Sequence, residues 1–238
     1  GIIGAVGNNE LGVAGVAQQT SIMALKFLDN RNTGYTSDAV RAINYATMMR
    51  SEHDINVRLL NNSWGGDVAS TTLLDAVDAS GQAGILFVTA AGNGDVLGRG
   101  YSLEDKPFYP ANLDLNSIVV VTALDNSGSV ARFSNWGRES VDVAAPGVGI
   151  LSTEPNGLYQ RRNGTSMAAP HVSGTAALIF AALPDITVPE VKKALMTSVD
   201  TNESLQHYVK SGGRLNAANA IQIDTYRPRV ASFTAADI

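Results

Sequence analysis

The chain has 238 residues, of which 45% are hydrophobic and 16% charged, and this length suits one large α/β domain. It contains no cysteine, which excludes disulfides, thiolate catalysis and cysteine-ligated zinc. The formal net charge of −5 predicts no nucleic-acid partner and no anionic membrane surface as partner. No apolar run reaches the roughly 18 residues expected of a membrane span.

The first part of the chain alternates between apolar and glycine-bounded stretches. Residues 1–6, GIIGAV, are predicted to be the tail of a buried helix, and residues 7–15 form a loop bounded by glycines. Residues 21–28, SIMALKFL, form a short apolar run whose length and flanks favour a buried strand.

Helical and strand patterns then alternate along the chain. Helices are predicted over residues 36–53, 70–84, 187–199 and 212–221, and strands over residues 57–66, 85–93 and 117–124. Residues 187–190, TVPE, form a capping box, and a turn-rich stretch follows residues 141–147. Because strands separated by helices of this length form right-handed crossovers, the sequence predicts a mostly parallel sheet covered by helices on both faces. A functional site is expected where the strands end, at their carboxyl edge.

A serine stands at the start of the next helical pattern. Residues 163–171 read NGTSMAAPH, and the apolar run VSGTAALIFAAL follows at once. Gly164 permits a tight turn, which places Ser166 in the first turn of the helix, where free backbone N–H groups favour negative charge. An oxyanion formed by attack of Ser166 on a carbonyl would meet these donors. A serine here can also be a simple helix cap.

The segment GTSMAAPHVSGTAAL resembles the nucleophile segment of the subtilisin-like serine proteases, the subtilases, almost residue for residue. The resemblance runs from Gly1 to about Ile221, and it implies the three-layer α/β/α fold of that family. It also implies a peptidase domain over residues 1–223 that lacks its N-terminal strand and its histidine-bearing helix. Residues 226–238 no longer match, and residues 224–238 are interpreted as a tail or as the start of a following domain.

The resemblance assigns roles to residues in three further motifs. Ser166 is the nucleophile, and Asn93 in TAAGNG provides an amide donor to the oxyanion. The substrate-binding residues are Ser63, Trp64 and Gly65 on one side and Ala90, Ala91 and Gly92 on the other. Small residues in the second wall favour a large uncharged side chain before the scissile bond. Trp64 can instead serve packing alone, and Tyr109-Pro110 resembles a cis-proline loop beside this pocket.

The catalytic base and the aspartate that orients it are expected upstream of Gly1. By the family pattern, a His-Gly-Thr-His segment would end just before this chain. His171 follows Ser166 by five residues on the same helix and is expected to be structural, while His53 and His207 match no motif. The acidic residues Asp29, Asp95 and Asp142 are interpreted as turn or loop residues.

The resemblance also implies a calcium ion held partly by Asn9 in the loop after residue 7. An amide oxygen surrounded by backbone carbonyls suits this hard cation, although Asn8 and Asn9 can equally be simple turn residues. The implied partners are a polypeptide substrate and the enzyme's own pro-segment, and the implied compartment is extracellular. The alternative function is that of a non-catalytic homologue whose groove binds peptides.

Overall fold

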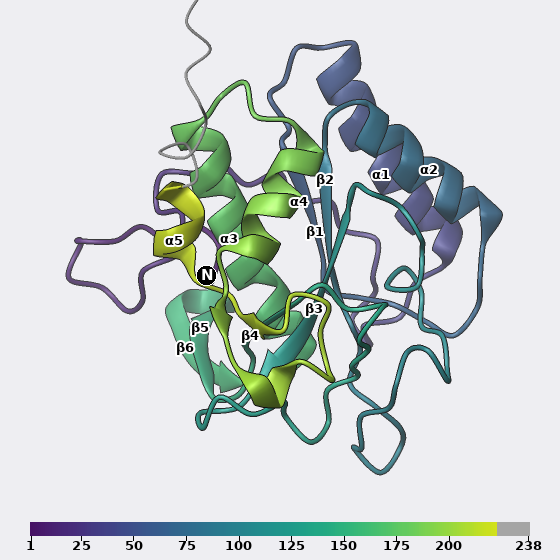
Figure 1. Cartoon of the computed structure of the whole chain (residues 1–238). Coiled ribbons are helices and arrows are strands. Elements are labelled where there is room, and N and C mark those ends of the chain that lie inside the picture. The colour runs from purple at the N-terminus through teal and green to yellow at the C-terminus, as the bar shows by residue number, and fades with distance from the viewer. Residues whose placement is uncertain (223–238) are drawn as a thin grey trace, which may run out of the picture.

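The computed structural model describes residues 1–222, and its centre is a six-stranded mixed sheet in the order β1-β2-β3-β4-β8-β7 (Figure 1). The strands and helices are β1 Leu59–Asn62, β2 Leu86–Ala90, β3 Ile118–Leu124, β4 Val143–Pro146, β5 Ile150–Glu154, β6 Leu158–Arg162, β7 Asp200–Thr201, β8 Gly213–Arg214, α1 Thr36–Ser51, α2 Thr71–Gln82, α3 Thr165–Ala182, α4 Val188–Thr197 and α5 Ala217–Ile221. Short 3-10 turns span Pro155–Gly157 and Glu203–Leu205. The predicted alternation of helices and strands is present from residue 36 onward, but the last predicted helix, 212–221, is shorter than expected: Gly213–Arg214 form the strand β8, and α5 begins only at Ala217.

The sheet is parallel except at one edge. β1 to β4 and β8 pair in parallel, while the two-residue strand β7 pairs with β8 in the antiparallel direction. The register places Asn62 opposite Thr89 and Ala90 opposite Val121. β2 and β3 are buried over their whole length, which explains why their sequences are continuous apolar runs instead of alternating ones.

Helices cover both faces of the sheet, which gives the predicted three layers. α1 and α2 pack on one face, around Phe87 and Val120, and α3 packs on the other, around Val88 and Val121. α3 is apolar almost all round because the sheet lies on one side of it and α4 and α5 lie on the other. The capping box predicted at Thr187 is present at the start of α4.

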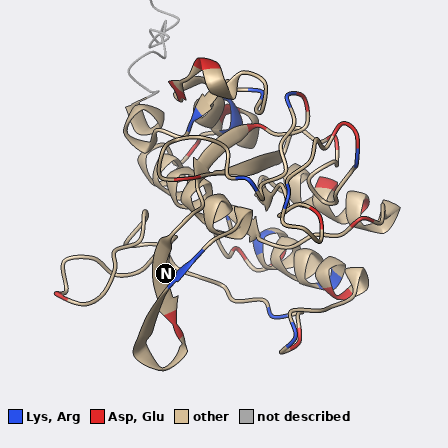
Figure 2. Cartoon of the chain, turned by 90° about the horizontal axis from the view of Figure 1, so that it is seen from below, with Lys and Arg blue, Asp and Glu red and all other residues tan. Residues whose placement is uncertain are grey.

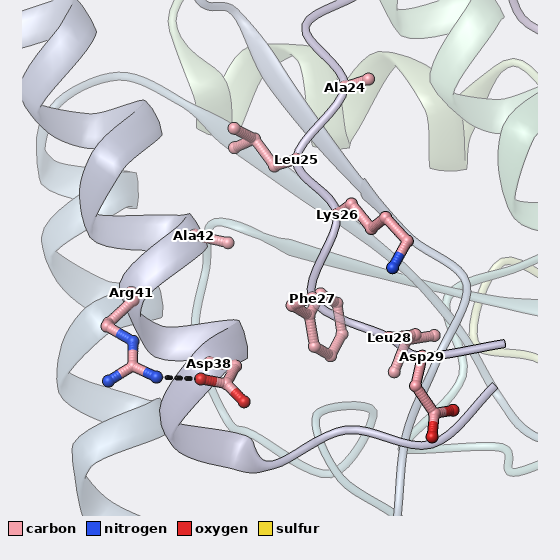
Figure 3. A pocket seen from close by; sticks show the side chains of 9 residues that line it. All are labelled: Ala24, Leu25, Lys26, Phe27, Leu28, Asp29, Asp38, Arg41 and Ala42. Atoms are coloured by element: carbon pink, nitrogen blue, oxygen red, sulfur yellow. Dashed lines mark hydrogen bonds and ion pairs between the residues drawn. The ribbon is translucent and has the colours of Figure 1, made fainter. Parts of the chain in front are cut away.

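The prediction of a strand at residues 21–28 was wrong. The segment is extended, but no backbone hydrogen bond joins it to any other part of residues 1–222. Several of its side chains are exposed, including Ile22 at 62%. Together with α1 it lines an open cavity of about 550 Å³, beside the ion pair of Asp38 and Arg41 (Figure 3). A strand exists only where another strand satisfies its backbone. β1 lies at one edge of the sheet, and among the described strands it pairs only with β2.

Another local prediction is met only in part. Residues 1–6 contain a single helical turn, closed by the bond from Ala5 N–H to the Gly1 carbonyl, but their side chains are exposed or half-buried instead of buried. The turn-rich stretch after residue 147 contains the β5–β6 hairpin, which stands clear of the three layers (Figures 1 and 2). The predicted domain end at residue 223 and the tail 224–238 lie outside the described residues.

Candidate active site

Ser166 is the second residue of α3, directly after the sharp turn at Gly164. Gly164 has φ 151° and ψ 156°, and its N–H donates to the Gly147 carbonyl at 2.9 Å. Glycine tolerates this positive φ because it has no Cβ. The turn places Ser166 where helix amides have no intrahelical acceptor and the helix dipole is positive. The Ser166 hydroxyl is partly buried and donates to the Ser63 carbonyl at 3.1 Å.

Asn93 lies beside this turn, and Thr165 fixes the orientation of its side chain. The Asn93 Oδ1 atom accepts from the backbone N–H of Thr165 at 2.9 Å and from its hydroxyl at 3.0 Å. The Thr165 hydroxyl in turn accepts from the Gly92 N–H at 3.2 Å. Because both bonds engage the oxygen, the Asn93 amide nitrogen keeps its two donors for another acceptor. Thr165 was not singled out from the sequence, although it stands inside the NGTS motif.

Hydrogen bonds connect the end of β1 and the segment after it to α3. The Ser63 hydroxyl donates to the Ser166 carbonyl at 3.1 Å and accepts from the Asn61 amide at 3.1 Å. Ser173 on α3 donates to the Asn61 Oδ1 atom at 2.8 Å. The predicted substrate strand and the predicted nucleophile therefore belong to one connected hydrogen-bond network. Asn61 and Ser173 were missed, although Ser173 stands inside the segment GTSMAAPHVSGTAAL, because they are 112 residues apart and only the fold brings them together.

The second predicted wall, Ala90 to Gly92, is buried; it begins with the last residue of β2 and continues into the segment after it. Asn135 holds it in place: its amide donates to the Ala91 carbonyl at 3.0 Å, and its N–H donates to the Gly92 carbonyl at 2.9 Å. Asn135 is only 1% exposed, and its oxygen accepts from the Tyr101 N–H at 3.3 Å. The sequence showed no sign of this role, because Asn135 lies in an ordinary SNWG stretch.

The cis peptide bond expected between Tyr109 and Pro110 is present. The loop that carries it is bound to the segment after β1, because Tyr109 and Gly66 exchange two backbone hydrogen bonds of 2.8 Å. Trp64 is partly buried; its indole N–H donates to Asn62 at 3.1 Å, and its ring meets Phe27 edge-on at 5.2 Å. These contacts are what a packing role predicts for Trp64, and they leave its role in substrate binding untested.

None of the three histidines forms a hydrogen bond with Ser166. The Nδ1 atom of His171 pairs with the Met167 carbonyl at 2.8 Å within α3. Burial lowers the pKa of His171, and the bond to the Met167 carbonyl opposes that shift. His53 and His207 are exposed. The arrangement fits the structural role expected of His171.

The three acidic residues have different environments. Asp29 and Asp95 each accept backbone N–H bonds within exposed turns, as expected. Asp142 is 5% exposed, so it is not a simple loop residue; it pairs with Lys192 at 3.2 Å and accepts from the Val120 N–H at 2.9 Å. Burial raises the pKa of Asp142, and the charge of Lys192 acts against this shift. The pair ties α4 to the beginning of β4.

Asn9 lies in the exposed loop that was assigned to calcium. Its Oδ1 atom accepts from the Leu11 N–H at 3.1 Å, which is the bond of a simple turn residue. Asn8 and Glu10 on either side have positive φ values of 57° and 59°. Within residues 1–222 there is no group of three or more histidine or acidic side chains that could hold a metal ion. Any cation here would rely on amide and backbone oxygens.

A serine in the first turn of a helix, next to an asparagine amide that is held in one orientation, is the arrangement found in serine hydrolases. The chain belongs to the subtilase family: the sequence model described as "Subtilase family" matches residues 1–217. This relationship supports serine peptidase activity.

Curated relatives agree with this family assignment. The chain is 37% identical to Subtilisin DY of Bacillus licheniformis over 215 residues, which is 90% of this chain and 73% of that protein. It is 37% identical to Subtilisin E of Bacillus subtilis, of which it spans about half (52%), and 34% identical to Thermitase of Thermoactinomyces vulgaris, of which it covers 72%. None of the helices in residues 1–222 has the length and apolarity needed to cross a membrane.

Proposed function

We propose that this chain provides the nucleophile and the oxyanion site of a serine endopeptidase. Ser166 attacks the peptide carbonyl, and the resulting oxyanion accepts hydrogen bonds from the Ser166 N–H and the Asn93 amide. The acyl-enzyme formed in this step is then hydrolysed by water. The observation that carries the proposal is the pair of bonds from Thr165 to the Asn93 oxygen, which leaves the amide nitrogen as the donor beside the serine.

The base and the aspartate that orients it come, in this proposal, from sequence preceding Gly1. In the described part of the chain, the Ser166 hydroxyl bonds to a carbonyl oxygen, which cannot accept its proton during attack. Backbone groups without partners also support an additional segment: among residues 1–222, no backbone hydrogen bond reaches residues 21–28, and no strand pairs with the outer edge of β1. A further strand would satisfy such groups.

Two finer assignments belong to the same proposal. Asn9 contributes one ligand to a calcium ion, since its oxygen has a second lone pair beyond the one used by Leu11. Calcium takes six to eight oxygens, so these loop residues fit only as part of a site to which other segments contribute. The site is structural and takes no part in catalysis. The enzyme is extracellular, its substrates are polypeptides, and its pro-segment is a partner.

The test compares two polypeptides, residues 1–238 alone and a form extended upstream through the expected histidine and aspartate. The extended form should hydrolyse peptide substrates and react with an organophosphorus serine probe, and its Ser166→Ala variant should do neither. Residues 1–238 alone should be catalytically silent and poorly folded. Equal turnover by both forms would overturn the assignment of the base and make His53, His171 and His207 candidates again.

The rival function is a peptide-binding module without catalysis. It predicts that the extended form binds peptides but neither cleaves them nor reacts with the probe at Ser166. An upstream sequence without an Asp-Thr/Ser-Gly and a His-Gly-Thr-His segment would favour this rival.

A further inference from the structure

One aromatic ring, that of Phe108, touches both predicted walls of the substrate groove. A Cβ atom placed on Gly65 would lie 2.3 Å from Phe108 Cε1, and one placed on Gly92 would lie 3.1 Å from Phe108 Cδ1. Gly65 belongs to the segment after β1, and Gly92 belongs to the segment after β2. The space that the two glycines leave open is therefore occupied by a side chain of the protein itself.

The main chain on each side of Phe108 is held in place. The Phe108 N–H donates to the Asn112 Oδ1 atom at 2.8 Å, and the Asn112 N–H donates back to the Phe108 carbonyl at 2.9 Å. The next residue, Tyr109, exchanges its two backbone bonds with Gly66. The ring can therefore move away only by rotating about its own side-chain bonds, and it packs against a core cluster that resists this.

The Phe108 side chain is half-buried, so part of its surface is not covered by the core. Two polar groups of the second wall, the Ala91 and Gly92 carbonyls, already accept hydrogen bonds from Asn135. A substrate side chain that enters between Gly65 and Gly92 would meet the apolar ring. A small apolar group can rest against it, whereas an aromatic substrate side chain needs the volume that the Phe108 ring already fills.

We propose that Phe108 forms the floor of the pocket for the residue before the scissile bond and restricts that residue to small side chains, such as those of alanine, glycine and serine. This inference rests on the proposed function, because it assumes that the groove presents peptides to Ser166. It replaces the expectation of a large uncharged side chain, which considered only the small residues of the walls. The ring that fills the space comes from a different segment.

The experiment uses the active, upstream-extended enzyme and chromogenic peptides that differ only in having alanine, leucine or phenylalanine before the scissile bond. The expected kcat/KM for alanine exceeds that for phenylalanine by at least about tenfold, the lower end of what misfit by a few carbon atoms causes. Phe108→Ala should raise kcat/KM for the phenylalanine peptide more than tenfold, because the lost ring leaves room for the substrate ring. The ratio of kcat/KM for the alanine peptide to kcat/KM for the phenylalanine peptide should then fall below one.

Phe108→Tyr is the matched control, since it keeps the ring and should keep the preference for alanine. Phe108→Leu removes less volume and should shift the preference toward leucine, which gives a second measurement if Phe108→Ala does not fold. The pocket assignment would be overturned, without affecting the proposed function, if the parent enzyme preferred the phenylalanine peptide. It would also be overturned if the variants changed kcat/KM for all three peptides by the same factor. Failure to hydrolyse any peptide would overturn the proposed function, and the pocket assignment with it.

Discussion

The Asn93 side-chain oxygen accepts two hydrogen bonds from one residue, Thr165: one from its backbone N–H and one from its hydroxyl. The backbone N–H can only donate, so the group facing it must be the amide oxygen and cannot be the nitrogen. Thr165 therefore decides which end of the Asn93 amide is left for other partners. Since Thr165 directly precedes Ser166, the proposed nucleophile and the proposed amide donor are positioned by the same turn of chain.

Replacing Asn93 by alanine should lower kcat with little change in KM in the complete enzyme. An oxyanion donor acts mainly in the transition state, so its loss affects kcat far more than substrate binding. The expected loss is about 10²–10³-fold, a magnitude measured for such a donor in a subtilisin, which belongs to this same family. Asn156→Gly, at the exposed tip of the β5–β6 hairpin, is the control and should leave both constants unchanged. A rise in KM alone would instead make Asn93 a substrate-binding residue.

Thr165→Val should reduce kcat by a smaller factor than Asn93→Ala. The variant keeps the backbone N–H bond to Asn93 but loses the hydroxyl, which also accepts from Gly92. One hydrogen bond contributes about 1–1.5 kcal/mol, so a five- to tenfold decrease in kcat is expected. Thr165→Ser retains the hydroxyl, so its kcat should stay close to that of the parent. A valine variant with parental kcat would show that the backbone bond alone orients the amide.

Glu104 should make stability depend on pH in the acidic range. Its carboxylate accepts from the Ser102 hydroxyl at 2.8 Å and from the N–H groups of Glu139 and Ser140 at 2.9 and 3.0 Å. Burial acts to raise the pKa of Glu104, but these bonds outweigh it and the net shift is downward. Because the folded pKa is depressed, the stabilisation is complete above the unfolded value of about 4.3 and is lost as pH falls through the folded value.

The comparison of Glu104 with its Gln variant isolates this effect. Glu104→Gln should have a lower melting temperature than the parent at pH 7, and the difference should shrink as the pH is lowered below about 4. Glu203→Gln is the control, because the Glu203 side chain is exposed. If the difference in melting temperature between the parent and Glu104→Gln stays constant from pH 7 to the acidic range, the carboxylate charge is excluded as its cause.

Chelation of calcium should lower the melting temperature of the complete domain. An ion that binds only the folded state stabilises that state by about 2.7 kcal/mol when the free ion concentration is a hundredfold above Kd. A chelator removes the ion and with it this stabilisation. Asn9→Ala should weaken the dependence on calcium, whereas Asn32→Ala, in another exposed loop, should not. A melting temperature unchanged by excess chelator would remove calcium from the proposal.

Much of the fold could be predicted because local pattern and tertiary environment agree. Val119, Val120 and Val121 form a β-branched run that is buried on both faces, and Thr187 with Glu190 forms the capping box that starts α4. Residues 21–28 show the opposite case. Their composition is that of a buried strand, but strand formation depends on a neighbour that the local sequence does not specify.

The site was predictable where a role belongs to a contiguous motif and not where it depends on contacts between distant segments. Ser166 and Asn93 were singled out from their own short motifs. Asn135, Asn61 and Phe108 act through partners tens of residues away, so no local pattern marks them. Asp142 shows the same limit, because its partner Lys192 lies fifty residues further along the chain.

The unpaired outer edge of β1 and the unbonded backbone of residues 21–28 also determine how the isolated chain behaves in solution. Within residues 1–222, both present N–H and C=O groups that have no backbone partner, and Ile22 and Met23 are 62% and 39% exposed. Exposed extended backbone next to apolar side chains pairs readily with the same segment of another molecule. Residues 1–238 alone should therefore form oligomers whose size grows with protein concentration in light scattering. Ile22→Lys should reduce this self-association, since a charge at an open edge repels an identical copy.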